Sequence, residues 1–331
     1  MCYIQANQQQ EVLLEKRDFM KILIIGAGAM GCLFAGRLKA QHAEVILHNR
    51  NNAHVEKINR SGLTIVERDN KETTIPLTVV QEVSKTVAYD VVVVLLKAHA
   101  TQAVMETMKD SFSRETLFIT MQNGLGNLEI LNKLFPDNPV VAGTMGCGAS
   151  VESNGRILHR GWGMNYIGRV EGAEANEKLL EFINLLNRSE LKTELAKDVQ
   201  SVIWNKLFVN VAFNSLTALT RLKNGDILNT DEGEEMLRNI VSEAVMVAKA
   251  EGVFADAEQV VSNCLKMGRE DIGANKSSML MDILHKRKTE IDAINGAVTK
   301  IGKRHGLATP YNELITGIIK VIEANYELQV D

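Results

Sequence analysis

The sequence predicts an α/β domain built on a mostly parallel β-sheet, followed by an all-α domain. Two observations predict the α/β domain. Short apolar runs alternate with helical patterns, and runs such as KILII (21–25) and DVVVVLL (90–96) are continuous rather than alternating. Such Val/Ile/Leu runs are typical of strands buried on both faces, in a parallel sheet covered by helices. The all-α domain is predicted by helical periodicity that continues almost without a break from about residue 198.

Each element follows from its own pattern. In the first half we expect strands at 21–25, 44–48, 63–67, 90–96, 116–121 and 139–143, then at GRILH (155–159) and MNYIGRV (164–170). Helices are expected near 29–40, 53–60, 99–109, 125–134 and 174–187. In the second half the helical pattern breaks at KNGD (223–226), AEGV (250–253) and GANKSS (273–278). We therefore expect an N-terminal extension without stable structure at 1–19, an α/β domain at 20–195 and a helical domain at 196–331.

Composition and charge exclude several classes of protein. The chain has 331 residues, of which 45% are hydrophobic and 24% charged, and its net charge is −4. No basic face stands out, because the HKRK cluster (285–288) is short and acidic residues follow it, so we expect no nucleic-acid partner. The longest apolar run, VVVVLL (91–96), is too short to span a bilayer. Four widely spaced cysteines, without metal-ligand spacing, indicate reduced thiols in a cytoplasmic protein and no metal site.

A glycine motif joins the first strand to the first helix. Gly26-x-Gly28-x-x-Gly31 follows the strand at 21–25 and opens the helix at 29–40. In a strand–helix–strand unit the first glycine permits a tight turn, the second lets the backbone approach a pyrophosphate, and the third allows close packing of helix and sheet. The same glycines could form a plain turn, but this context favours a dinucleotide site of the Rossmann type. That site would be formed by Gly26, Ala27, Gly28, Ala29, Met30 and Gly31.

The end of the next strand indicates which dinucleotide binds. NAD-binding proteins usually carry an acid here for the ribose hydroxyls, but VILHNR ends in Asn49 and Arg50. A guanidinium suits a 2′-phosphate, so NADPH/NADP⁺ is favoured over NAD; the alternative is an ordinary surface arginine. Lys97 and Asn123 each follow a predicted strand, at the sheet edge where ligands of open α/β sheets bind. Lys97 could also be a solvated surface lysine, and Asn123 could be part of a plain turn.

A polar stripe runs along an otherwise apolar helix, WNKLFVNVAFNSLTALT (204–220). At about 100° per residue, Lys206, Asn210 and Asn214 lie at roughly 0°, 40° and 80°, and Thr217 joins them at about 20°. The stripe could face water on an ordinary amphipathic helix. It could instead line a polar cleft and bind a small polar ligand.

A series of motifs in a fixed order then identifies a resemblance. These motifs are GAGAMG, LLKAHA, MQNGLG, VAGTMGCGA, WNKLFVNVAFN, NKSSMLMDI, TEIDAINGAV and HGLATP. From about 20 to 325 the chain resembles the ketopantoate reductase (2-dehydropantoate 2-reductase) family. The resemblance implies reduction of the 2-oxo acid ketopantoate to pantoate by NADPH, in pantothenate and coenzyme A biosynthesis. It also implies an active site between a Rossmann domain and a helical domain.

The resemblance also implies roles for single residues. Gly26 to Gly31 would hold the pyrophosphate and Arg50 the 2′-phosphate, while Lys97, Asn123 and Ala149 would line the cofactor path. Lys206 would be the catalytic lysine, since an ammonium can stabilise the developing charge on the keto oxygen and deliver a proton. Asn210, Asn214 and Ser278 would bind substrate, with Asn275 as a further candidate. Glu290 would be an acid beside nicotinamide and substrate, opposing the fall of the Lys206 pKa that burial causes. Without the resemblance, Glu290 reads as a surface acid and Ser278 as a helix N-cap.

Several alternatives remain open at this point. Cys147 stands in a glycine-rich loop, where well-studied members of the family carry other residues, and paralogues act on other substrates. The chain could therefore reduce a different 2-oxo acid, or it could sense NADP without catalysis. A helical interaction module would instead expose an apolar patch on 198–331, and a homodimer could form there.

Overall fold

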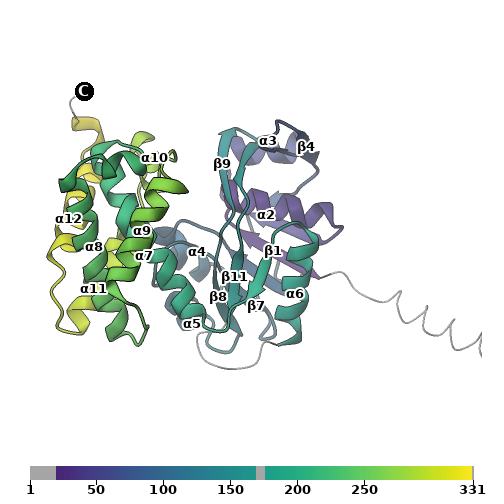
Figure 1. Cartoon of the computed structure of the whole chain (residues 1–331). Coiled ribbons are helices and arrows are strands. Elements are labelled where there is room, and N and C mark those ends of the chain that lie inside the picture. Colours follow the sequence, from purple (N-terminus) through teal and green to yellow (C-terminus); the bar gives the residue numbers. More distant parts are fainter. Residues whose placement is uncertain (1–19, 169–175, 330–331) are drawn as a thin grey trace, which may run out of the picture.

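The computed structural model describes residues 20–168 and 176–329, and the predicted N-terminal extension lies outside these ranges. A sheet-containing part and a bundle of helices lie side by side (Figure 1). The helix α7 (Val199–Thr220) contacts strands β8 and β11 of the sheet (β8, Val140–Thr144; β11, Asn165–Gly168), so it forms the boundary between the two parts. The predicted class, a mostly parallel α/β part followed by a helical part, is confirmed.

An eight-stranded sheet forms the centre of the first part. Its strands are β1 (Lys21–Ile25), β2 (Glu44–His48), β5 (Val79–Val80), β6 (Val91–Val94), β7 (Leu117–Thr120), β8, β11 and β12 (Thr193–Leu195), in the spatial order β12-β11-β8-β7-β6-β1-β2-β5. The strands from β8 to β5 in this order pair in parallel, whereas β11 is antiparallel to β8. The carboxyl ends of the parallel strands therefore meet at one edge, where the predicted cofactor residues are placed.

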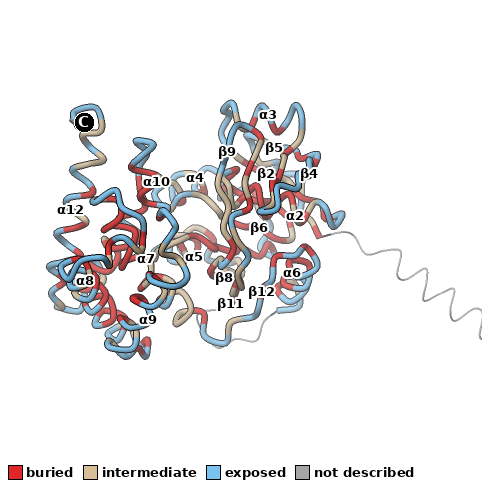
Figure 2. Tube along the Cα trace, turned by 45° about the horizontal axis from the view of Figure 1, so that its top comes forward, coloured by how far each residue is buried: buried red, intermediate tan, exposed pale blue. Residues whose placement is uncertain are grey.

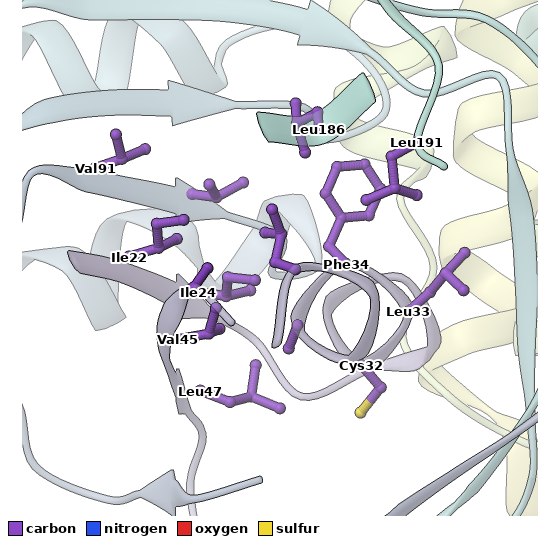
Figure 3. Close-up of a cluster of buried hydrophobic side chains, with 14 of the residues drawn as sticks. Ile22, Ile24, Cys32, Leu33, Phe34, Val45, Leu47, Val91, Leu186 and Leu191 are labelled. Carbon is purple, nitrogen blue, oxygen red and sulfur yellow. The ribbon is translucent and has the colours of Figure 1, made fainter. Parts of the chain in front are cut away.

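The strands of this sheet are buried on both faces, as their continuous apolar runs predict. Ile22 and Ile24 point into one apolar cluster, which contains Phe34 from α2 (Ala29–Ala40) and Leu186 from α6 (Glu177–Arg188) (Figure 3). The other face of β1 packs with residues of α4 (Thr101–Glu106) and α5 (Asn127–Leu134) in a second cluster. Burial on both faces fixes the position of the turn that follows β1.

A second, four-stranded sheet covers the outer side of α2. It consists of β3 (Leu63–Val66), β4 (Glu72–Ile75), β9 (Gly148–Ser153) and β10 (Arg156–Gly161), in the order β4-β3-β10-β9. The helix α2 contacts strands of both sheets, and Gly36 lies against Ile65 of β3, where an added Cβ would come within 2.7 Å of its side chain. Strands were predicted at two of its positions, 63–67 (β3) and 155–159 (β10), but the second sheet itself was not, because β4 and β9 are short or polar. The brief strands β5 and β12 of the first sheet were not predicted either.

The remaining helices complete the two parts. The first part adds α3 (Ala53–Ser61) and the short 3₁₀ helix η1 (Ala98–Ala100). The bundle contains α7, η2 (Gly225–Asn229), α8 (Asp231–Ala250), α9 (Ala257–Glu270), α10 (Ser278–Leu284), η3 (Ile291–Ala293), α11 (Asn295–Arg304), α12 (Pro310–Ala324) and η4 (Tyr326–Leu328). The breaks predicted near 223–226, 250–253 and 273–278 lie at helix ends: they overlap the start of η2, the last residue of α8 and the first residue of α10. The helix predicted at 99–109 divides into η1 and α4, and the ends of the elements predicted at 164–170 and 174–187 extend into 169–175, outside the described residues.

An apolar stripe is exposed on α12, at the outer edge of the bundle (Figures 1 and 2). Tyr311, Leu314, Ile318 and Val321 are spaced three or four residues apart, so they lie on one face, and Leu314 and Val321 are 64% and 63% exposed. The helical part therefore carries an exposed apolar patch, while the homodimer stays a prediction. Within residues 20–168 and 176–329, no helix has both the length and the apolar character needed to cross a membrane.

The start of α12 depends on one buried carboxylate. Glu243 of α8 accepts hydrogen bonds from the backbone N–H groups of Tyr311 and Asn312 at 2.9 Å each, and from Asn312 Nδ2 at 2.7 Å. Thr309, the N-cap residue, makes no capping bond. Glu243→Ala removes the acceptor of two backbone N–H groups and one of the two acceptors of Asn312 Nδ2, which keeps its bond to the Ile240 carbonyl, so we expect the free energy of unfolding to fall by about 3 kcal/mol in urea denaturation. Glu313→Ala, which removes only the exposed ion pair with Lys303, should cost less than about 1 kcal/mol. Equal effects of the two variants would contradict the assignment.

Candidate active site

A cleft of about 2430 Å³ opens at the carboxyl edge of the parallel strands. One wall is formed by β9, β10 and residues near β4, and the other by residues 271–290 of the helical part, around α10. Figure 1 shows β9 and α10 on the two sides of this region. Ligand sites for drug-sized molecules are usually about 300–1,000 Å³, so this cleft has room for a dinucleotide together with a small acid.

Residues 26–31 join β1 to α2, include the first three residues of that helix and contribute to the lining of the cleft; they will be called the dinucleotide turn. Gly26 has φ +114°, and an added Cβ would lie 2.7 Å from the carbonyl oxygen of Leu95. A Cβ on Gly31 would lie 1.8 Å from the carbonyl oxygen of Gly26, so the helix can start here only with glycine at that position. A Cβ on Gly28 would meet nothing within 4 Å, because this residue faces the open cleft. The first and third glycines therefore build the turn, and the second leaves space for a ligand.

The start of α2 is free to bind an anion. Gly28 is the N-cap residue, no side chain caps the helix, and its first turn contains no acid. The unpaired N–H groups and the positive end of the helix dipole therefore point toward the cleft. Asn49 Oδ1 accepts from the Ala27 N–H at 3.3 Å, and Asn49 Nδ2 donates to the Arg50 carbonyl at 2.9 Å. The exposed Arg50 side chain lines the cleft beside this turn.

Lys97 joins the two parts of the molecule at the cleft. Its Nζ lies 2.6 Å from Asp282 Oδ2 and 3.3 Å from Glu290 Oε2, while Glu290 Oε1 accepts from the Ala98 N–H at 3.1 Å. Burial alone would lower the pKa of Lys97, but the charges of Glu290 and Asp282 outweigh it and raise that pKa. Asp282 is also bonded to Arg287 Nε at 3.1 Å. Lys97 therefore lines the cleft as a member of a charged cluster that links β6 to α10 and η3.

Lys206 lies beside the same cleft, held by a main-chain group. Its Nζ donates to the carbonyl oxygen of Met145 at 2.9 Å, and Met145 itself lines the cleft. Burial lowers the pKa of Lys206 to about 8, while the nearby Cys147 and Glu290 act in the opposite direction. Glu290 makes its hydrogen bonds to Lys97 and Ala98, so it acts on Lys206 through its charge. A lysine with a pKa near neutrality can give up a proton at working pH.

Two amides on the same helix face lack partners. The Nδ2 atoms of Asn210 and Asn214 are buried and make no hydrogen bond. Leaving a buried donor unpaired costs about 1–3 kcal/mol, and such atoms are uncommon in native structures. Thr217 is different, because its hydroxyl bonds Ser277 Oγ at 2.7 Å in a contact between α7 and α10. The unsatisfied part of the stripe is therefore limited to Asn210 and Asn214, next to Lys206.

The predicted residues divide into two layers. The residues that line the cleft are Gly26, Gly28, Ala29, Met30, Asn49, Arg50, Lys97, Asn123, Ala149, Asn275, Ser278 and Glu290. The predicted residues that do not line it in this structure are Ala27, Gly31, Lys206, Asn210 and Asn214, although Lys206 bonds to Met145, which does. Ser277, not Ser278, is the N-cap of α10, so Ser278 is the first helical residue and stays exposed to the cleft.

Two groups at the site were not predicted from the sequence. Asp282 accepts from Lys97, from which it is separated by 185 residues. The Met145 carbonyl is a backbone group and carries no side-chain signal. The motif NKSSMLMDI contains Asp282, and an acid buried within a short apolar helix is the one feature that could have marked it. Among the residues that the structure describes, no three His, Cys, Asp or Glu side chains are grouped to hold a metal ion.

Known protein families match this chain over most of its length. Residues 22–172 match a family described as ketopantoate reductase PanE/ApbA, and residues 198–323 match its C-terminal domain. A 2-dehydropantoate 2-reductase of Halobacterium salinarum is 28% identical over 92% of this chain and 99% of its own length. A 2-dehydropantoate 2-reductase of Vibrio cholerae is 29% identical over 93% of this chain and 99% of its own.

Two of the similar solved structures have names that give different activities. A D-mandelate dehydrogenase with NADH and anilino(oxo)acetate superposes with a TM-score of 0.86 at 26% identity, covering 93% of this chain and all of its own. A PanE/ApbA family ketopantoate reductase from Ralstonia eutropha superposes with a TM-score of 0.85, at the same identity and coverage. The fold and the order of domains are therefore shared by enzymes that act on different small 2-oxo or 2-hydroxy acids.

Proposed function

The chain belongs to the ketopantoate reductase family, whose members are NADP-dependent oxidoreductases, and on this premise we propose that it reduces ketopantoate to pantoate with NADPH. The observation that carries the proposal is the group formed by Lys206 and the two unpaired amides of Asn210 and Asn214, on one face of α7 beside the cleft. A buried cation and two free donors suit a small anion with further oxygens. A 2-oxo acid is such a molecule. Its place would be in the biosynthesis of pantothenate and coenzyme A.

The dinucleotide turn fits the cofactor. Gly28 leaves open space at the uncapped start of α2, where the backbone N–H groups would hold the pyrophosphate. Asn49 carries no charge to repel a 2′-phosphate, and Arg50 would bind it. Asn123 and Ala149 would line the path toward the substrate. When bound, the cofactor supplies the hydride that reaches the keto carbon.

Lys206 would deliver the proton to the keto oxygen. Its ammonium has three N–H donors, so Lys206 can keep its bond to the Met145 carbonyl while another N–H donates to the substrate oxygen. The negative charge that develops on the oxygen then lies next to a positive group. Ser278 and Asn275 line the cleft and would bind the substrate carboxylate, while Glu290 supports the positive charge of Lys206.

The second candidate is a reductase of another 2-oxo acid, and the D-mandelate dehydrogenase neighbours favour it. Both candidates use the same cation and the same donors, so they differ only in the side chain of the substrate. A protein that senses NADP without catalysis would not need the unpaired amides at Asn210 and Asn214.

The experiment compares substrates directly. We would follow NADPH oxidation at 340 nm with ketopantoate and with the 2-oxo acid that corresponds to mandelate. The proposal expects kcat/KM to be at least tenfold higher for ketopantoate. A preference for the aromatic acid would favour the second candidate. Tight binding of NADPH without turnover of either acid would favour a protein that senses NADP without catalysis.

The pH profile is a separate prediction. The proton that Lys206 donates is lost as pH rises through its pKa of about 8 in the free protein, so kcat/KM should be constant below pH 7 and fall about tenfold per pH unit above 9. Burial raises the pKa of the Cys147 thiol to about 11, so the midpoint of its titration lies above this fall. The measurement is kcat/KM for ketopantoate between pH 6 and 10. A profile that stays flat to pH 10 would show that Lys206 is not the acid.

A further inference from the structure

The carbonyl that holds Lys206 belongs to a short loop, residues 145–147, which will be called the Met145 loop. It connects β8 to β9 and lies against the loop between β10 and β11. The two backbones touch: a Cβ on Gly163 would lie 2.3 Å from the Gly146 carbonyl oxygen, and a Cβ on Gly146 would lie 2.3 Å from that of Met164. Only glycine at both positions permits this approach.

One buried side chain fixes the Met145 loop. Asn165, at the start of β11, is 0% exposed, and its Oδ1 accepts from the Gly146 N–H at 3.0 Å and from Cys147 Sγ at 3.5 Å. The Asn165 backbone N–H donates to the Lys192 carbonyl at 2.8 Å, which ties it to the segment leading into β12. The loop is thus anchored to the sheet at the residue that follows Met145.

The anchor matters because Asn165 Oδ1 is the acceptor for the Gly146 N–H, whereas the close packing against Gly163 and Met164 gives that N–H no acceptor. Gly146 is exposed, and its N–H could bond to water if Oδ1 were removed. A glycine freed in this way gains a wide range of backbone conformations. Any rotation of the peptide between Met145 and Gly146 turns the Met145 carbonyl away from Lys206, because that carbonyl and the Gly146 N–H belong to the same peptide unit.

We propose that Asn165 is a positioning residue, which holds the Met145–Gly146 peptide so that its carbonyl orients the Lys206 ammonium beside the cleft. The proposal rests on the proposed function, in which Lys206 donates a proton. The other ionisable groups near Lys206 are the Cys147 thiol on the Met145 loop and Glu290 with its partner Lys97 across the cleft. Asn165 bonds one of them, Cys147, so it controls both the acceptor and a neighbour of the lysine.

The test compares Asn165→Leu with a matched control. Leucine has a similar volume but no acceptor, so the Met145 loop loses its anchor. Thr193→Val is the control: Thr193 is also buried and its Oγ1 accepts from Asn165 Nδ2 at 3.5 Å, but it makes no bond to the loop. Stability is followed by thermal unfolding, so that a general loss of folding is separated from a local effect.

Two readouts are measured on the full-length protein. The first is kcat with ketopantoate, which should fall at least about tenfold in Asn165→Leu and less than about twofold in Thr193→Val. The second does not need activity: competitive acetylation across pH, followed by peptide mass spectrometry, gives the pKa of Lys206. The loss of the acceptor for the charged amine should lower that pKa below its wild-type value in Asn165→Leu only.

A second variant covers the case in which Asn165→Leu does not fold. Gly163→Ala forces a Cβ against the Gly146 carbonyl, so it displaces the Met145 loop directly, and it should change both readouts in the same direction. If the folded variants leave kcat and the titration of Lys206 as in the wild type, the proposal is overturned. If the wild type reduces no 2-oxo acid, the proposed function fails, and the acetylation experiment still decides whether Asn165 positions Lys206.

Discussion

Lys206→Ala should lower kcat for ketopantoate by about 100-fold or more, the usual size of a general-acid contribution. The variant removes the only ammonium on α7 that lies beside the cleft, and the Met145 carbonyl is left without its donor. Charge that develops on the keto oxygen then has no positive group next to it. The measurement is NADPH oxidation under saturating conditions, with NADPH binding followed separately by fluorescence. Binding should change less than about threefold, because the lysine lies away from the dinucleotide turn.

Asn205→Ala provides the control for this variant. Asn205 is exposed on the same turn of α7, so its removal tests for a general disturbance of the helix. The control should keep kcat within about twofold of wild type. Retention of more than a tenth of wild-type kcat in Lys206→Ala would mean that another group, or water, supplies the proton.

The fold was largely predictable because local patterns determine it. Continuous apolar strands and a glycine motif between a strand and a helix are features of neighbouring residues, and β1, α2 and β2 lie where the sequence places them. The second sheet was missed for the same reason. Its strand β4 reads ETTI and β9 reads GASVES, and neither carries an apolar run. Such strands form because α2 offers them a surface, which is a tertiary effect.

The site was predictable only where one helix or one turn contains it. The polar stripe on α7 follows from helical spacing, so Lys206, Asn210 and Asn214 could be grouped from the sequence. The partners of these residues could not, because they come from distant segments: the Met145 carbonyl is 61 residues away from Lys206. Thr217 shows the limit of the pattern, since it shares the stripe but bonds to Ser277. Helical periodicity predicts which residues share a face of a helix, but it does not predict which groups of other segments lie against that face.

The sequence also could not predict which charged partners Glu290 has in the structure. The resemblance places it beside the nicotinamide and the substrate, and in the structure it lines the cleft, where it bonds Lys97 and the Ala98 N–H. A carboxylate that neutralises one lysine has less influence on a second. The strong fall in the Lys206 pKa therefore arises because burial exceeds the combined effect of Cys147 and Glu290.

Among substitutions of exposed residues, Arg50→Ser should have the largest effect on the preference for NADPH over NADH. A charge-assisted contact with a phosphate contributes about 1.5–3 kcal/mol, so the ratio of kcat/KM for NADPH over NADH should fall about 10- to 150-fold. The change should come from NADPH alone, because Arg50 is expected to touch only the 2′-phosphate. The similar D-mandelate dehydrogenase was solved with NADH, so the ratio of the two cofactors is an informative quantity to measure. The measurement is the rate at 340 nm with each cofactor at limiting concentration.

Arg68→Ser separates a specific contact from general attraction. Arg68 is also an exposed cation that lines the cleft, but it lies beyond β3 and not at the end of β2. If cofactor preference depends on a guanidinium bonded to the 2′-phosphate, Arg68→Ser leaves the NADPH/NADH ratio within about threefold of wild type. If preference depends on the positive charge of the cleft as a whole, both variants lower the ratio similarly, and added salt weakens the effect in wild type. Because Asn49 has no charge in either variant, its amide cannot restore a preference for NADH in the way that a carboxylate on the ribose would. The expected product of Arg50→Ser is therefore an enzyme that has lost NADPH without gaining NADH.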